Sequence, residues 1–166
     1  MSNEPVPSII IFDVNETLLD ITTLEPLFER IFGDPSVFRE WFAQLILYSQ
    51  TMTLSGLYAP FSELGVGSLR MVAEIRGITV ADGDVDELKQ RMGKMPAHPD
   101  VVPALTRLLD AGFRLVTLTN SASMSSPTPL ELAGISKFFE RSFNVESVRK
   151  FKPAPDTYRH VATELG

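Results

Sequence analysis

The chain has 166 residues and a net charge of −6, from 21 acidic and 15 basic residues. It shows no Lys/Arg cluster, which argues against a nucleic-acid partner, and it has no cysteine, which excludes disulfides, thiolate metal sites and cysteine nucleophiles. A hydrophobic share of 44% with 22% charged residues is typical of a globular protein that buries a core. The apolar run near the N-terminus covers only residues 9–12, too short for a signal sequence or a membrane span. We therefore expect a soluble, cytoplasmic protein without a membrane partner.

The first predicted element is a strand over residues 9–12, an unbroken run of isoleucines ending in phenylalanine. Such a run without polar alternation is typical of a strand in a parallel sheet, buried on both faces. Asp13 follows it directly.

Residues 21–93 predict helices and contain no strand-like run. Apolar residues recur at helical spacing over residues 37–46, and further helices are predicted over about 60–76 and from about residue 84. This stretch is predicted to be a helical insert.

The remainder alternates helix and strand. A helix is predicted between Pro99 and Gly112, a strand over residues 113–119, a short helix after Gly134, a strand near residues 141–145 and a helix from about Ala154. The order predicts an α/β fold with a Rossmann-like parallel sheet. Residues 1–20 and 94–166 would form its discontinuous core, and residues 21–93 the inserted helical domain.

Three segments at predicted strand ends carry reactive side chains. Asp13 ends the first strand, where open α/β sheets bind ligands, although a turn aspartate is an equal alternative. Thr119 and Asn120, with Ser121, end the second strand and can bind an anion, although a plain helix cap is an alternative. Lys152 lies between Phe151 and Pro153 and can neutralise a carboxylate, although most such lysines are solvated. The two histidines, His98 and His160, have no ligand spacing and are interpreted as structural.

Taken together, these segments resemble the haloacid dehalogenase superfamily. The order Phe12-Asp13-x-x-x-Thr17-Leu18, then Leu118-Thr119-Asn120, then Lys152-Pro153 is similar to that superfamily's first three motifs, and the helical insert resembles its cap domain. The chain looks most like the type II (L-2-haloacid) dehalogenases, in which a Lys-Pro segment is followed by a tyrosine at the position of Tyr158.

Asn15 distinguishes two reactions of that superfamily. Its phosphatases carry a second aspartate at this position, which protonates a leaving alkoxide, whereas an amide has no acidic proton to give. A halide leaves without a proton, so Asn15 favours dehalogenation on chemical grounds. An Asx-type turn is the alternative role of this side chain.

The resemblance implies a mechanism. Asp13 would attack C2 of a 2-haloalkanoic acid and form an ester, which water then hydrolyses. Lys152 would keep Asp13 ionised and Thr17 would hydrogen-bond near it. Thr119 and Asn120 would hold the substrate carboxylate, and Asn15 would also contact the substrate. Tyr158 would support the site. No cofactor or metal is implied, apart from Mg²⁺ if the chain is a phosphatase.

The chain departs from the family pattern at two places. Phe42 occupies the position of the family's halide-accepting arginine, and Arg39, three residues earlier on the same predicted helix, is either its substitute or an exposed side chain. The family's fourth motif, which carries an acidic residue, is absent, so we expect either a fragment of a longer protein or an incomplete site.

Three functions therefore stay open at the level of sequence. The first is hydrolysis of carbon–halogen bonds, the second a Mg²⁺-dependent phosphatase of the same fold, and the third a catalytically incomplete domain that binds a small acid or a partner. In the first two the partner is a small-molecule acid, and a homodimer is a further possibility.

Overall fold

The protein is described by a computed structural model that covers residues 8–122 and 126–166. In these ranges three strands form one parallel sheet, in the order β1-β2-β3. The strands are β1 (Ile9–Phe12), β2 (Arg114–Thr119) and β3 (Arg141–Asn144). Because the strands are parallel, their carboxyl ends meet at one edge of the sheet.

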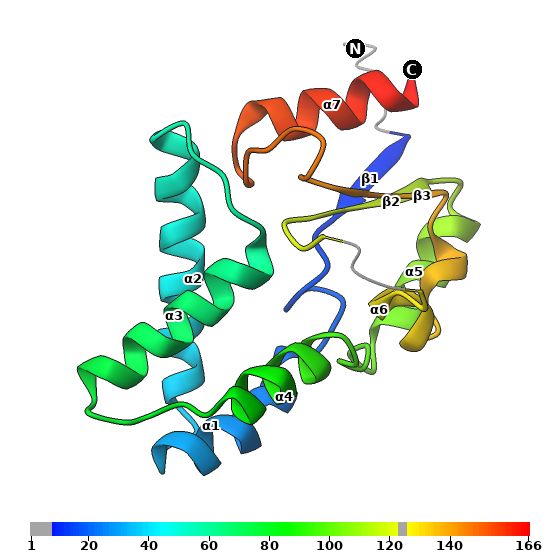
Figure 1. The fold of residues 1–166 in the computed structure, drawn as a ribbon. Coiled ribbons are helices and arrows are strands. Elements are labelled where there is room, and N and C mark those ends of the chain that lie inside the picture. The colour runs from blue at the N-terminus through cyan, green and yellow to red at the C-terminus, as the bar shows by residue number, and fades with distance from the viewer. Residues whose placement is uncertain (1–7, 123–125) are drawn as a thin grey trace, which may run out of the picture.

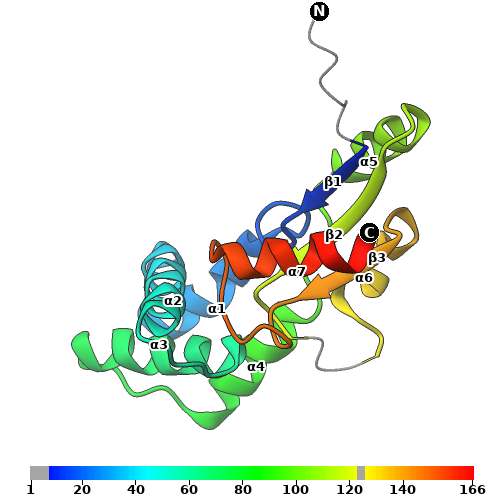
Figure 2. The ribbon, with the colours of Figure 1, turned by 90° about the horizontal axis from the view of Figure 1, so that it is seen from above.

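The helices form two groups around this sheet. Their bounds are η1 (Ile21–Leu24), α1 (Glu25–Phe32), α2 (Val37–Leu54), α3 (Phe61–Ile75), α4 (Asp82–Met92), α5 (Val101–Asp110), α6 (Pro129–Leu132), η2 (Ser136–Phe138) and α7 (Pro155–Leu165). Helix α7 lies over one face of the sheet, and α5 and α6 lie on the other side (Figure 1). Helices α1 to α4 stand together beyond the carboxyl ends of the strands (Figures 1 and 2). The α/β class with a parallel sheet is confirmed.

The central strand β2 has the burial that its sequence predicts. Its residues 115–118 are all at most 1% exposed, since β2 pairs on both sides and helices cover both faces. For β1 the prediction of burial on both faces is wrong, because Ile11 is 39% exposed and the rest of the strand is half-buried. Among the described strands β1 pairs with β2 alone, so its other side lacks the cover that β2 receives.

Most of the predicted helices are observed with small shifts of their ends. Helix α2 continues to Leu54, eight residues beyond the apolar pattern, and α1 at Glu25–Phe32 was not predicted. The short helix expected after Gly134 is the 3₁₀ turn η2. No strand lies between residues 21 and 93, all of which the structure describes.

One continuous apolar cluster joins the helices α1 to α4 to the sheet, and includes Phe28, Trp41, Leu69 and Val116. Within it the rings of Phe28 and Trp41 lie 5.2 Å apart, and the Trp41 indole Nε1 donates to the carbonyl of Gly65 at 2.8 Å. These contacts hold α1, α2 and α3 together. Of the helices that the structure describes, none is long and apolar enough to cross a membrane.

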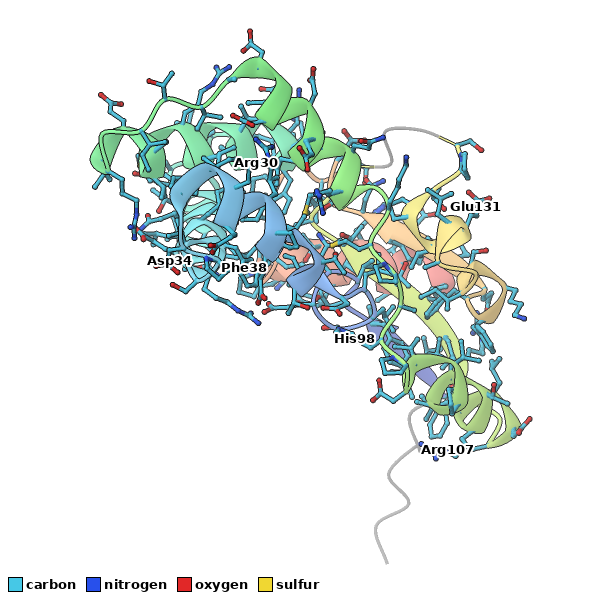
Figure 3. The ribbon with its side chains drawn as sticks, turned by 90° about the horizontal axis from the view of Figure 1, so that it is seen from below. Arg30, Asp34, Phe38, His98, Arg107 and Glu131 are labelled. Atoms are coloured by element: carbon cyan, nitrogen blue, oxygen red, sulfur yellow. The ribbon has the colours of Figure 1, made fainter. Side chains whose placement is uncertain are left out.

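An ion-pair cluster joins α1 to α4 at the surface. The Arg30 guanidinium donates to Asp84 and to Glu87, both at 2.7 Å, and Figure 3 shows Arg30 in the region where these helices lie. The hydrogen bond from Arg30 holds the pKa of the Asp84 carboxyl below its usual value. Arg30 is 52% exposed, whereas Asp84 and Glu87 are 14% and 31% exposed, so these ion pairs are partly shielded from solvent and fix α1 against α4.

Candidate active site

The candidate nucleophile Asp13 is the first residue after β1 and lies at the edge where the strands end. Its Oδ1 accepts a hydrogen bond from the Lys152 ammonium at 2.5 Å, and its Oδ2 accepts one from the Thr17 hydroxyl at 3.0 Å. The Asp13 side chain remains 46% exposed, whereas that of Lys152 is only 15% exposed. The carboxylate is therefore oriented by two donors and still accessible to a small molecule.

Lys152 reaches this position from the loop between β3 and α7. Its Nζ also donates to the carbonyl of Leu118 in β2, and its backbone N–H donates to Oδ1 of Asn120 at 2.8 Å. The lysine is thus fixed at both ends, its backbone by Asn120 and its ammonium by Leu118 and Asp13. Lys152 is therefore held in a defined ion pair with Asp13 and differs from a solvated surface lysine.

The polar residues after β2 face the residues after β1. The Thr119 hydroxyl accepts a hydrogen bond from the backbone N–H of Ser121 at 3.1 Å. The Asn15 amide donates to the Ser121 hydroxyl at 3.2 Å, across 106 positions of sequence. Within the described residues the side-chain NH₂ of Asn120 has no hydrogen-bond partner, since its contact with Lys152 uses the amide oxygen. An amide donor is therefore available next to Lys152, the residue that contacts Asp13.

The turn that carries Asp13, residues 13–20, is fixed by the segment before α5. The backbone N–H of His98 donates to Leu18 at 3.0 Å, and that of Asp20 donates to Pro96 at 2.8 Å. Within the turn Glu16 adopts a left-handed conformation with φ 71°, which few non-glycine residues adopt. The His98 ring, labelled in Figure 3, contacts the Glu16 carbonyl at 3.1 Å and so adds a side-chain contact to this turn. The structural role predicted for His98 agrees with this contact.

Among the described residues, three predicted site residues make no hydrogen bond or ion pair with the Asp13 carboxylate. Arg39 is exposed and forms an ion pair with Glu16, and its guanidinium stacks over the ring of Phe38. Phe42 is half-buried, with its ring 6.1 Å from that of Trp41. Tyr158 is 41% exposed and makes no hydrogen bond to any residue that the structure describes. Asp13, Thr17, Asn15, Thr119, Asn120 and Lys152 are brought together, whereas these three lie outside that group.

A pocket of about 480 Å³ opens beside the group. Asn15 and Ser121 form part of its wall. Apolar side chains from α2, α3 and α4 form a second part, and Ala122, Pro127, Pro129 and Leu132, at and before α6, form a third. No group of three or more His, Cys, Asp or Glu side chains with the geometry of a metal site exists within residues 8–122 and 126–166.

One contact behind Lys152 was not predicted from the sequence. The buried ring of Phe151 stacks on Tyr58 at 5.2 Å and packs against Phe61 at 5.9 Å, and its backbone N–H donates to the Thr53 hydroxyl at 2.9 Å. The segment that carries Lys152 therefore rests on the end of α2 and the start of α3. No local pattern indicates such a contact, because its partners lie about 100 positions apart.

The sequence and the fold match known proteins over nearly the whole chain. The haloacid dehalogenase-like hydrolase family model matches residues 7–166. The (S)-2-haloacid dehalogenase 1 of Pseudomonas sp. strain CBS-3 is 26% identical over 157 residues, which are 93% of this chain and 69% of that protein. The (S)-2-haloacid dehalogenase of Xanthobacter autotrophicus is 25% identical over 159 residues, which are 95% of this chain and 62% of that protein.

The structure of the L-2-haloacid dehalogenase from Xanthobacter autotrophicus superposes with a TM-score of 0.87 at 25% identity, and the match covers 97% of this chain and 66% of that one. The chain thus spans about two thirds of the length of these relatives. Because the family match covers more than nine tenths of the sequence, the chain belongs to the haloacid dehalogenase-like hydrolases.

Proposed function

We propose that the protein hydrolyses the carbon–halogen bond of 2-haloalkanoic acids through an ester on Asp13. The observation that carries this proposal is the Asp13 carboxylate, which is exposed and held by Lys152 on one oxygen and Thr17 on the other. The activity in the names of the two curated relatives supports the same reaction class.

The reaction proceeds in two steps. An oxygen of Asp13 attacks C2 of the acid, the carbon–halogen bond breaks, and the halide leaves with the bonding electron pair and with inversion at C2. Water then adds to the Asp13 carbonyl carbon, and the 2-hydroxy acid departs with the oxygen that Asp13 supplied. The ammonium of Lys152 stabilises the negative charge of the carboxylate before the attack and after the hydrolysis.

The substrate carboxylate binds at the end of β2. The NH₂ of Asn120, which has no hydrogen-bond partner among residues 8–122 and 126–166, donates to it. Thr119 holds the backbone of this turn through the hydrogen bond from Ser121. Such a site places the acid next to Asp13, and C2 then faces the carboxylate oxygen. The proposed role of Tyr158 is support from α7, and that of Phe42 and Arg39 is to line the approach of the halide.

Asn15 favours this reaction over phosphate-ester hydrolysis. Its amide nitrogen donates to the Ser121 hydroxyl, so the side chain is oriented as a hydrogen-bond donor. It supplies no proton for a leaving alkoxide, which a halide does not need. We accordingly propose a reaction without a metal or another cofactor.

The organisation of the chain is part of the proposal. Residues 1–20 and 94–166 form the catalytic core, and residues 21–93 form a cap over the carboxyl ends of the strands. The position of α1 to α4 beyond these strand ends supports this division (Figure 1). A cytoplasmic location and a homodimer remain predictions, and sedimentation velocity of the purified chain tests the second.

The test of the function is a panel of substrates with and without Mg²⁺. Release of halide from 2-chloropropanoate and 2-bromopropanoate, unchanged by EDTA, is the expected result. Phosphate release from a phosphate monoester that requires Mg²⁺ would support the phosphatase instead. Binding of the acids without release of either ion would support a catalytically incomplete domain.

A further inference from the structure

The pocket beside Asp13 is larger and more apolar than the smallest haloacids require. Its volume is about 480 Å³, whereas a water molecule takes up about 30 Å³ in the liquid. A three-carbon haloacid, with about six non-hydrogen atoms, would leave most of this space to water. The apolar wall includes Trp41, Leu45, Phe61, Val66, Leu88 and Met92.

The pocket adjoins the two turns that carry the residues around Asp13. Asn15, two residues after Asp13, and Ser121, two residues after Thr119, both line it, and they are hydrogen-bonded to each other. Asp13 and Asn120 themselves do not line the pocket, so a substituent on a substrate held there has to pass Asn15 and Ser121 to reach this wall. The polar residues of the wall that come from α4 and the turn after it, Lys89, Gln90 and Lys94, are all exposed, so they form its edge toward solvent.

The geometry points to a substrate class, on the basis of the function proposed above: 2-haloalkanoic acids whose C2 carries an alkyl or aryl-alkyl substituent of several carbons. The substituent lies in the pocket between α2, α3 and α4 on one side and α6 on the other, and the acid and C2 remain at Asp13. Removal of such a group from water contributes about fourfold in affinity per methylene.

The first experiment measures kcat/KM for halide release along the series 2-bromopropanoate, 2-bromobutanoate, 2-bromohexanoate and 2-bromooctanoate. We expect a rise of about tenfold or more between the propanoate and the hexanoate, less than the full methylene increment because the pocket wall is partly solvated. A flat or falling series overturns the inference and leaves the proposed function intact.

A variant that fills the pocket gives the second readout. Val66→Phe places a ring in the pocket from α3, and the ratio of kcat/KM for the octanoate to that for the propanoate should fall at least tenfold. Ile75→Phe is the matched control, because Ile75 lies on the same helix, is 73% exposed and does not line the pocket. An equal loss for both acids in Val66→Phe would contradict the inference.

A binding measurement separates this inference from the function itself. Trp41 is the only tryptophan of the sequence and lines the pocket, so its fluorescence reports occupancy without turnover. Titration with 2-hydroxyoctanoate should give a lower Kd than titration with lactate, and Val66→Phe should remove the difference. If 2-hydroxyoctanoate binds more tightly than lactate but no haloacid is hydrolysed, the proposed function is wrong and the preference of the pocket for long substituents is supported. Equal Kd values for the two hydroxy acids overturn that preference.

Discussion

The Lys152 ammonium lies 2.5 Å from Oδ1 of Asp13, although 139 positions separate the two residues in the chain. The contact exists because β1 and β2 are neighbours and the loop after β3 returns across their ends. The fold thus joins a carboxylate and a cation that neither local sequence would pair.

The first prediction concerns Asp13 itself. Asp13→Asn should lower kcat by a factor on the order of 10³ or more, because a neutral amide is a far weaker nucleophile than a carboxylate. Halide release measures the loss, and Asp110→Asn at the exposed end of α5 is the control. In ¹⁸O-water a single turnover of the wild type should give unlabelled 2-hydroxy acid and one labelled oxygen in Asp13. Label in the product of the first turnover would instead mean direct attack by water.

The second prediction concerns the cation. Lys152→Met should lower kcat on the order of 100-fold, because the carboxylate loses the charge that stabilises it and the donor that orients it. Lys150→Met provides the control, since Lys150 pairs with Asp156 at 3.0 Å and is two residues away. Comparable losses in the two variants would indicate damage to the loop rather than loss of the ion pair.

The strands, and the position of Asp13 directly after β1, were predictable because their signals are local. The unbroken apolar run of residues 9–12 predicts a strand whatever its place in the sheet. The end of that run then gives the position of Asp13 at the end of the strand. The burial of β1 was not predictable in the same way, because the exposure of Ile11 depends on which strand lies next to it.

The environment of Lys152 was not predictable from local patterns. The last two turns of α2 contain polar residues of weak helix propensity, including Thr53. The apolar pattern that predicts the helix therefore ends before the helix itself does. The helix continues because α2 packs against α3, and this extension brings Thr53 to Phe151. The missed contact and the missed helical turns therefore have one cause, which is tertiary packing.

The third prediction tests Thr53 as a positioning residue. Thr53→Val keeps the shape but leaves the buried N–H of Phe151 without its acceptor, a loss of about 1–3 kcal/mol, and the adjacent Lys152 shifts. We expect kcat to fall about tenfold with KM nearly unchanged, because a misplacement of about 1 Å can already slow such reactions about 100-fold. Thr53→Ser should restore kcat, since it retains the hydroxyl.

Thr51→Val is the matched control for this variant. The Thr51 hydroxyl donates only to the Leu47 carbonyl of its own helix, at 2.9 Å. A fall of kcat in Thr51→Val as large as that in Thr53→Val would show that the helix, and not the contact to Phe151, is responsible.

The fourth prediction decides the role of Arg39. In the structure this arginine forms an ion pair with Glu16, which lies in the turn that carries Asp13. Arg39→Gln should therefore loosen that turn and lower kcat only about threefold, because an exposed ion pair contributes little. Glu16→Gln removes the same pair and should have the same effect. If Arg39 instead accepts the halide, Arg39→Gln alone should cause a loss on the order of 100-fold, and Glu16→Gln should not.

The last prediction concerns Asp20, which begins η1 at the junction between the catalytic turn and the helices. Its Oδ1 accepts hydrogen bonds from the backbone N–H of Thr22 at 2.9 Å and from the Thr22 hydroxyl at 2.6 Å, and these bonds hold the pKa of Asp20 below its usual value of 3.8. Asp20→Ala should lower the free energy of unfolding by about 1 kcal/mol at neutral pH, as expected for loss of a helix cap, whereas Asp20→Asn retains the acceptor and should lose less.

The two variants also differ in their dependence on pH. Because the pKa of Asp20 is lower in the folded than in the unfolded chain, the stabilising contribution of its charge is complete above the unfolded pKa and disappears as the pH falls through the folded pKa. The difference in unfolding free energy between the wild type and Asp20→Asn should therefore be constant from pH 7 to about pH 5 and should shrink below about pH 4. Urea unfolding followed by circular dichroism measures it. A difference that grows as the pH falls would mean that the carboxylate of Asp20 is destabilised in the folded protein, contrary to its hydrogen bonds with Thr22.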